Sequence, residues 1–221
     1  MSGAGPHQGQ PLAWAGRPLA EAAAAMVMIH GRGATAESIL TLADEFGRDD
    51  FAYVAPQAAD WSWYPYRFLA PTQQNEPGLS SGLARIGEVV AQLEAGGMPA
   101  ARIVLLGFSQ GACLGLEFAV RNPRRYGAVI GLSGALIGPP GTHRDFHRDH
   151  PGVLAGTPVF LGCSDRDPHI PLESVHETAA ILKAMGAEVT ERIYSALGHM
   201  VNQDELDRVR RLLDGVACSS K

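Results

Sequence analysis

The sequence predicts an α/β protein, with one domain over residues 1–221 built on a mostly parallel central sheet that helices cover on both faces. Two observations lead to this fold class. Short β-rich runs alternate with longer helical runs along the chain, which is the order that builds βαβ units. Most of the β-rich runs are continuously apolar, as expected for strands that are buried on both faces of a parallel sheet.

The expected elements follow one another with few interruptions. Six strands are expected, at Ala24–His30, Phe51–Pro56, Arg102–Gly107, Tyr126–Ser133, Pro158–Cys163 and Glu188–Tyr194. Five helices are expected, at Thr35–Phe46, Leu79–Ala95, Gln110–Arg121, Leu172–Met185 and Gln203–Leu213. Residues 1–21 form a polar N-terminal segment outside the pattern, and two irregular stretches, 57–78 and 135–156, interrupt it. Loops of that length inside a compact domain tend to be functional.

Local chemistry marks several helix ends. Thr35 is expected to be a plain N-cap, because Ser38 rather than Glu stands at the capping-box position. Pro123 ends the helix that begins near Gln110, since the residue before a proline avoids the helical conformation. Gly186 can adopt the left-handed conformation that closes the helix before it.

Composition excludes several classes of protein. The formal net charge of −5 leaves no basic excess for binding nucleic acid or an anionic membrane surface. The three cysteines are an odd number at no metal-like spacing, which argues against a disulfide framework and favours a reducing, cytoplasmic location. The apolar stretch 22–29 is too short to span a bilayer, so no stable membrane insertion is expected.

A serine stands between glycines where one strand is expected to end and a helix to begin. Gly107-Phe108-Ser109-Gln110-Gly111 fits the G-x-S-x-G pattern of a nucleophile elbow, and the strand before it and helix after it are the context that confirms the pattern. The glycines are required because side chains at those positions would collide as the turn closes. Ser109 is therefore the candidate nucleophile.

A serine hydroxyl needs a base to take its proton, and the order for this kind of fold is serine, acid, histidine. His199 is the candidate base because it follows the last expected strand in the loop after Gly198. Asp165 and Asp167 both follow the preceding strand, and spacing alone does not choose between them; the other could hold the turn through its own backbone bonds. His169 lies beside the acid and is expected to line the cleft.

Acyl transfer also needs hydrogen-bond donors for the developing oxyanion. The backbone N–H of Gln110 directly follows the nucleophile, and that of Arg32 lies in the His-Gly turn after the first buried strand. No phosphate-binding glycine motif follows this strand.

Three further histidines (His143, His147 and His150) share a loop with two aspartates, and we expect a charged, solvated loop there rather than a metal site.

These pieces together resemble the phospholipase/carboxylesterase family of α/β-hydrolases, which includes bacterial carboxylesterases and acyl-protein thioesterases. The matching stretches are MIHGRGATAESI, GFSQGACLGLEFA, DRDPHIP and GHM, and the likeness extends from about Ala24 to Leu213. The family's acid directly precedes the proline, so the resemblance implies Asp167 as the acid, with Arg32 and Gln110 at the oxyanion positions. Many members carry leucine at the Arg32 position, and the arginine is expected to place a cation near the cleft mouth.

An aromatic segment lies in the first irregular stretch and is expected to wall an apolar substrate pocket, as family members place a similar segment near the nucleophile. Its candidate pocket residues are Trp61, Trp63, Tyr64 and Tyr66. The competing interpretation is that these rings only pack the loop onto the sheet.

The function that these residues predict is that of a serine carboxylesterase on short-to-medium acyl esters, with no metal or organic cofactor. Thioesters and lysophospholipids make the same demands on a triad and remain alternatives, as does a non-catalytic binding protein on the same scaffold. A peptidase is disfavoured because the chain has no room for an added domain that restricts peptide access. The sequence leaves the oligomeric state, monomer or homodimer, open.

Overall fold

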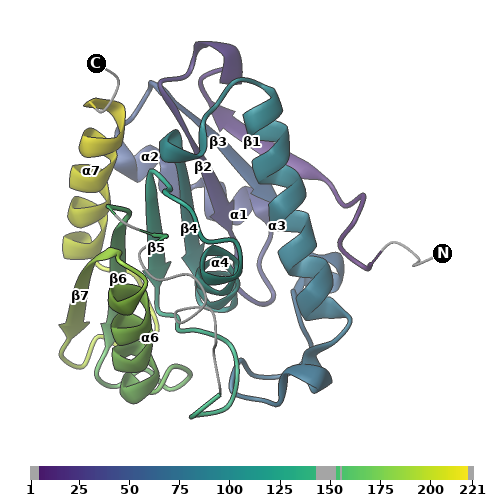
Figure 1. Cartoon of the computed structure of the whole chain (residues 1–221), viewed down its shortest axis with the longest axis vertical. Coiled ribbons are helices and arrows are strands. Elements are labelled where there is room, and N and C mark those ends of the chain that lie inside the picture. Colours follow the sequence, from purple (N-terminus) through teal and green to yellow (C-terminus); the bar gives the residue numbers. More distant parts are fainter. Residues whose placement is uncertain (1–4, 143–152, 155, 219–221) are drawn as a thin grey trace.

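A seven-stranded sheet forms the centre of the molecule (Figure 1). The computed structural model describes residues 5–142, 153–154 and 156–218. The strands are β1 Leu12–Gly16, β2 Ala24–Ile29, β3 Phe51–Pro56, β4 Ile103–Phe108, β5 Ala128–Leu132, β6 Pro158–Ser164 and β7 Glu188–Tyr194. Their order in the sheet is β1-β3-β2-β4-β5-β6-β7, and all pairs are parallel except β1 with β3. The mostly parallel α/β architecture is confirmed.

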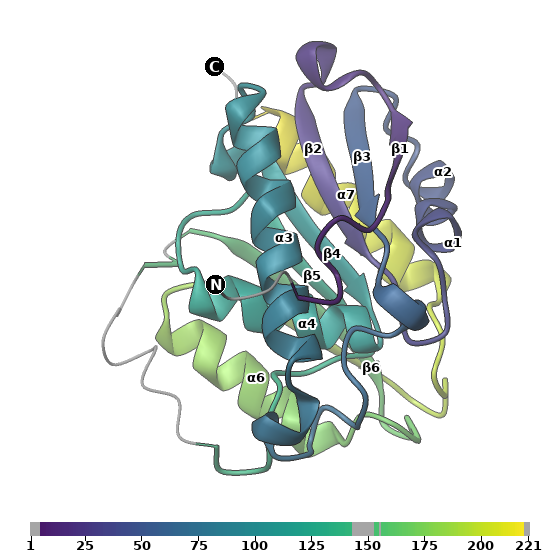
Figure 2. The same ribbon diagram turned by 90° about the vertical axis from the view of Figure 1, so that its right-hand side faces the viewer.

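Helices cover both faces of this sheet. They are α1 Ala36–Leu40, α2 Leu42–Phe46, α3 Gly78–Ala95, α4 Gln110–Arg121, α6 Leu172–Ala184 and α7 Gln203–Cys218. Short 3₁₀ turns lie at Leu19–Glu21, Ala59–Trp61, Thr72–Asn75 and Ala100–Arg102. Helices α3, α4 and α6 lie on one face, and α1, α2 and α7 on the other (Figures 1 and 2).

Strand residues alternate between two hydrophobic cores, one on each face. In β2, Val27 and Ile29 pack on the side of α3 and α4, whereas Met26 and Met28 pack on the side of α1 and α7. All six residues of β2 are buried. This two-sided burial is why the central strands read as unbroken apolar runs in the sequence.

The N-terminal part of the chain differs from the expectation of a polar segment. Residues Leu12–Gly16 form strand β1, which pairs antiparallel with β3 at the edge of the sheet. His7, expected in a polar tail, is buried with 2% of its surface exposed. A five-residue edge strand with half-exposed side chains carries only a weak hydrophobic pattern, so its sequence gives little sign of it.

The helix expected over Thr35–Phe46 is two short helices that meet at Thr41. Thr35 is more than a plain N-cap, because a full capping box is present: its hydroxyl accepts from the Ser38 N–H, and the Ser38 hydroxyl accepts from the Thr35 N–H. Serine thus performs the role usually given to glutamate. Gly186 has a φ of 87° and closes α6 as predicted.

Strand β7 lies at the other edge of the sheet and pairs with β6. Its side chains alternate, with Glu188, Thr190 and Arg192 exposed and the intervening ones partly buried. No helix in the described ranges is long and apolar enough to cross a membrane.

Candidate active site

Ser109 occupies a strained turn between β4 and α4. Its φ of 55° and ψ of −120° are rarely adopted by a residue with a side chain, and its N–H donates to the Leu132 carbonyl at 2.9 Å. Glycine is required at each of the two flanking positions for a different steric reason. A Cβ on Gly107 would collide with the backbone of Gly111, and a Cβ on Gly111 would collide with the Ile29 carbonyl. The G-x-S-x-G spacing therefore lets the turn close against β2.

His199 lies between the serine and an aspartate. Its Nε2 is 2.8 Å from the Ser109 Oγ, and its Nδ1 is 2.7 Å from the Asp167 Oδ2. The ring packs against the Phe108 and His169 rings, at centroid distances of 5.0 and 4.8 Å. The structure thus brings together three side chains that the sequence places after β4, β6 and β7. All lie beyond the carboxyl ends of parallel strands, where α/β sheets collect their functional groups.

The Asp167 carboxylate is held from both sides. Oδ1 accepts the N–H groups of His169 and Ile170, at 2.8 and 3.1 Å, while Oδ2 faces the His199 ring. Burial raises the pKa of Asp167, but the hydrogen bonds from His199 and the two amides outweigh burial and place the pKa below its usual value. The group is therefore an anion suited to stabilise a protonated imidazole.

Asp165 points elsewhere. Its Oδ1 accepts the Ala196 N–H at 2.7 Å, which supports the loop that carries His199. The Ser164 hydroxyl accepts the Gly198 N–H in the same loop at 3.0 Å. Of the two aspartates that spacing leaves open, Asp167 contacts the imidazole and Asp165 holds the turn.

The two candidate oxyanion donors lie next to the nucleophile. Arg32 belongs to the turn after β2, where Gly31 approaches the Ser109 side chain closely enough that a Cβ on Gly31 would lie 3.4 Å from the Ser109 Cβ. Gln110 is the first residue of α4, so its N–H has no acceptor one turn earlier in the helix. Arg32 and Gln110 also line a cavity that Ser109 lines.

A cavity of about 670 Å³ opens beside these groups. Its apolar wall comes from aromatic and aliphatic side chains of several segments, namely Tyr64, Pro65, Tyr66, Phe68, Phe108 and Ile170. Ser109 and His199 line it together with His169, as expected for that histidine. The volume and the mostly apolar lining are typical of a small-molecule site.

Two of the four aromatic residues expected along the pocket lie elsewhere. Tyr64 and Tyr66 line the cavity, but Trp61 is 58% exposed away from it, and Trp63 is fully buried. Trp63 packs between the His7 and His30 rings, at centroid distances of 5.2 and 5.1 Å, and its indole N–H donates to the His30 carbonyl. For Trp63 the packing interpretation is therefore the correct one.

The histidines on either side of Trp63 are neutral hydrogen-bonding groups. The His7 Nδ1 accepts the Ala59 N–H at 3.1 Å, which leaves Nε2 to donate to the Trp63 carbonyl at 2.9 Å. The His30 Nε2 accepts the Ala58 N–H at 3.1 Å, and its Nδ1 donates to the Gly31 carbonyl. Burial lowers the pKa of both rings.

A buried carboxyl group that the sequence did not single out packs against β6, the strand that precedes Asp167. Glu205 is fully buried, its Oε2 accepts the Asn202 N–H at 2.8 Å, and its Oε1 has no hydrogen-bond partner among the described residues. Burial raises the pKa of Glu205 to about 7. Gly162 in β6 makes room for this carboxyl, since a Cβ there would collide with it. The Asn202–Glu205 spacing is a capping box, which is the signal that could have identified it.

Other pocket residues were also missed, although the motifs contain them. Phe108 is the variable residue directly before the nucleophile, and Ile170 belongs to the stretch after the acid. Phe68 continues the aromatic segment. The loop with His143, His147 and His150 lies outside the described residues, and within those residues no cluster of histidine, cysteine or acidic side chains could hold a metal ion.

Comparison with known proteins identifies the family of the chain. The profile of the phospholipase/carboxylesterase family matches residues 16–216. A solved phospholipase/carboxylesterase from Dyadobacter fermentans is 43% identical, with a TM-score of 0.87 over 94% of this chain and 97% of that one. Acyl-protein thioesterase 1 of Neurospora crassa is 26% identical over 86% of this chain and 85% of its own length. The Zea mays acyl-protein thioesterase 2 structure, 20% identical with a TM-score of 0.70 over 94% and 99% of the two chains, shares the fold. The chain therefore belongs to the phospholipase/carboxylesterase family of α/β-hydrolases.

Proposed function

We propose that the protein is a serine carboxylesterase that hydrolyses short-to-medium acyl esters through an acyl-enzyme. The observation that carries this proposal is the continuous hydrogen-bonded series from Asp167 through His199 to Ser109, with both separations under 3 Å. A hydroxyl in contact with an imidazole that is itself oriented by a carboxylate is the arrangement that activates serine.

The proposed reaction has two halves. The Ser109 Oγ attacks the ester carbonyl while His199 Nε2 takes its proton, and the oxyanion forms between the N–H groups of Arg32 and Gln110. His199 then gives the proton to the leaving alcohol, and Asp167 stabilises the imidazolium in between. Water, activated by the same histidine, releases the acyl group and regenerates the serine. No step requires a metal or an organic cofactor.

The size and lining of the cavity support the choice of substrate. A largely apolar cavity of about 670 Å³ beside Ser109 offers room for an acyl chain, with Tyr64, Tyr66 and Phe68 along its wall. A thioesterase is the second candidate, because the family includes proteins named acyl-protein thioesterases and one of them aligns over most of this chain. Lysophospholipids fit the same chemistry.

A panel of p-nitrophenyl esters from acetyl to palmitoyl, with an acyl thioester alongside, tests this proposal. We expect the highest kcat/KM between acetyl and octanoyl, and labelling of Ser109 by a fluorophosphonate probe. Ser109→Ala should lose labelling and lower ester turnover by at least a thousandfold while keeping its circular dichroism spectrum. Retained turnover in this variant would falsify the nucleophile assignment. A folded wild type that the probe does not label would favour a non-catalytic binding protein.

A further inference from the structure

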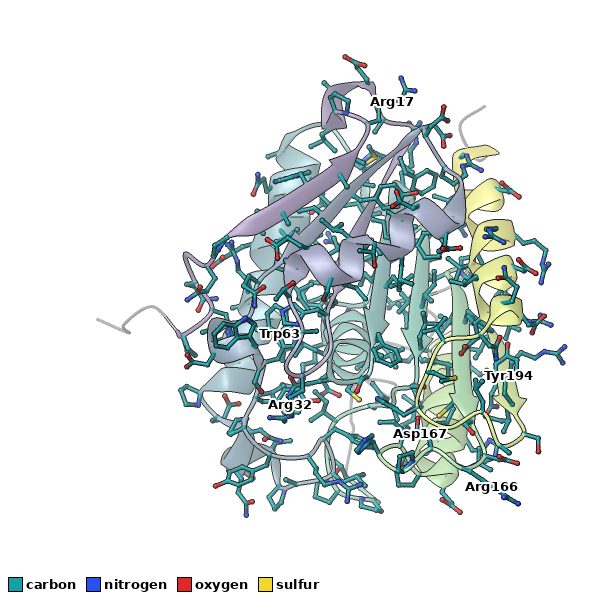
Figure 3. The ribbon with its side chains drawn as sticks, turned by 180° about the vertical axis from the view of Figure 1, so that it is seen from behind. Arg17, Arg32, Trp63, Arg166, Asp167 and Tyr194 are labelled. Carbon is teal, nitrogen blue, oxygen red and sulfur yellow. The ribbon has the colours of Figure 1, made fainter. Side chains whose placement is uncertain are left out.

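The guanidinium of Arg32 is engaged with a single loop. Nη1 donates to the Ser62 hydroxyl at 2.9 Å and to the Pro65 carbonyl at 3.0 Å. Nη2 donates to the carbonyls of Tyr64 and Tyr66, both at 2.7 Å. Arg32 lines the cavity, in line with the cation expected near the cleft mouth, and its side chain directs four hydrogen bonds to residues 62–66, which we call the clamped loop. Figure 3 shows Arg32 at the Asp167 end of the sheet and Arg17 at the opposite end.

The Gln110 side chain holds the same loop with further hydrogen bonds. Its Nε2 donates to the Tyr64 carbonyl at 2.8 Å, and its Oε1 accepts the Trp63 N–H at 3.0 Å. Arg32 and Gln110 are the two residues whose backbone N–H groups form the proposed oxyanion hole. The side chains of both residues therefore bond the clamped loop.

The clamped loop also forms part of the wall of the cavity. Tyr64, Pro65 and Tyr66 line it, next to Arg32, Gln110 and Ser109. Asn75 fixes the far end of the loop, because its Oδ1 accepts the Tyr66 N–H at 2.9 Å and its Nδ2 donates to the Arg67 carbonyl at 3.1 Å. Arg32 supplies four of the hydrogen bonds that tie the loop to the proposed oxyanion residues, and Gln110 adds those to Trp63 and Tyr64.

We propose that the Arg32 side chain is a positioning residue that fixes the acyl-pocket wall relative to the oxyanion amides and thereby sets acyl chain-length selectivity. This inference rests on the proposed esterase function. The planar guanidinium suits the role because its donors form a rigid fork that can meet several carbonyls at once. Lysine carries the same charge at a single point and can meet only part of this set of acceptors.

Loss of the clamp should have two separable effects. When the loop is no longer held, the wall can retreat and accept longer acyl chains, so selectivity should flatten. The Arg32 amide should also lose its fixed position, and small displacements of catalytic groups cost large factors in rate. We expect Arg32→Met to lower kcat on the butyrate ester about tenfold and to lower the butyrate-to-decanoate ratio of kcat/KM at least fivefold, with Arg32→Lys intermediate.

The experiment compares Arg32→Met and Arg32→Lys with wild type, and uses Arg17→Met as the matched control. Arg17 also bonds a backbone carbonyl, that of Asp49 at 2.8 Å, but far from the site. Kinetics are measured across the ester series, and hydrogen exchange is followed in the segment 62–67. Exchange there should rise at least tenfold in Arg32→Met and stay at the wild-type rate in Arg17→Met.

The two readouts separate this inference from the proposed function. If wild type hydrolyses esters but Arg32→Met keeps both the chain-length ratio and the exchange rates, the positioning role is overturned. A uniform loss on all esters without a change in ratio overturns the selectivity role in the same way. If wild type hydrolyses no ester while exchange rises in Arg32→Met, the clamp stands and the esterase proposal fails. Should Arg32→Met not fold, Arg32→Lys decides between these outcomes.

Discussion

Two aspartates two positions apart do different work at the end of β6. Asp167 contacts the imidazole of His199, whereas Asp165 accepts the Ala196 N–H and supports the loop that carries that histidine. Nothing in residue type separates them. The direction of each side chain does, and this direction comes from the turn that follows the strand.

Asparagine substitutions at Asp165 and Asp167 should measure the difference between their roles. Asp167→Asn removes the charge that we propose stabilises the imidazolium, and should lower kcat by about three to four orders of magnitude. Asp165→Asn keeps an oxygen that can accept the Ala196 N–H and should lower kcat by about tenfold at most. Steady-state kinetics on one ester distinguish the two, and similar losses in both variants would contradict the assignment.

Glu205 makes stability depend on pH in an unusual direction. Burial raises the pKa of this carboxyl to about 7 in the folded protein, from the ordinary value of 4.5. Between those values the folded state holds a proton that the unfolded state has lost, so its contribution to the free energy of unfolding is present below about pH 4.5 and is lost as the pH rises to about 7. Above pH 7 the cost of burying the charge is fully expressed.

We expect Glu205→Gln to remove that slope. The glutamine oxygen can still accept the Asn202 N–H. The difference in unfolding free energy between the variant and wild type should therefore grow in favour of the variant from pH 5 to pH 7, by on the order of 1 kcal/mol. Urea titrations at several pH values measure this difference. A difference that does not change with pH would show that the carboxyl is ionised throughout.

At the scale of elements, the loop between β3 and α3 is anchored through Trp63. Its indole lies between two histidines that come from the N-terminal segment and from the end of β2. The ring is fully buried, whereas that of Trp61, two positions earlier, is 58% exposed. The two tryptophans therefore form a matched pair for mutation.

Trp63→Ala should lower the free energy of unfolding by about 3–5 kcal/mol, the usual cost of emptying a large buried aromatic site. Trp61→Ala should change it by no more than about 0.5 kcal/mol, since surface substitutions rarely do more. Denaturant unfolding monitored by circular dichroism compares them. Equal losses would mean that Trp63 is not the anchor.

Because of the two histidines around Trp63, we expect the protein to lose stability in acid. Burial lowers the pKa of His7 and His30 below the ordinary value of 6.5, so below pH 6.5 the unfolded chain binds more protons than the folded one. Their contribution to stability is fully present above pH 6.5 and decreases as the pH falls. His7→Gln should reduce this loss between pH 6.5 and pH 5, as measured by thermal unfolding across that range.

At the scale of the whole molecule, the parts that the sequence predicts best are those with a local cause. The β4–Ser109–α4 unit has the predicted form because glycine is required at both flanks of the serine, and α4 begins and ends where expected. The candidate base follows from its place after β7, whereas the place after β6 left Asp165 and Asp167 open, and the family resemblance implied Asp167. Local rules such as these act within a few residues, so one sequence is enough to apply them.

What the sequence did not predict depends on distant contacts. The burial of His7 and the clamp of Arg32 on Tyr64 join segments 56 and 32 residues apart, and nothing near either residue signals the partner. Trp63 and Tyr64 are neighbours in an aromatic run, yet only the folded loop decides that Tyr64 lines the cavity and Trp63 packs behind it. Strand β1 is similar, since it needs β3 as a template.

The edge of the sheet at β7 has a consequence for how the protein behaves when concentrated. An outermost strand offers unpaired backbone groups on which a strand from another molecule can be added. The charged groups of Glu188 and Arg192, both exposed on this strand, oppose the addition of another strand because they keep this edge of the sheet hydrated. Replacing both with valine should cause self-association visible by light scattering, whereas the same change at the exposed Glu177 and Lys183 of α6 should not. Resistance to self-association would then depend on two side chains that lie outside the candidate active site.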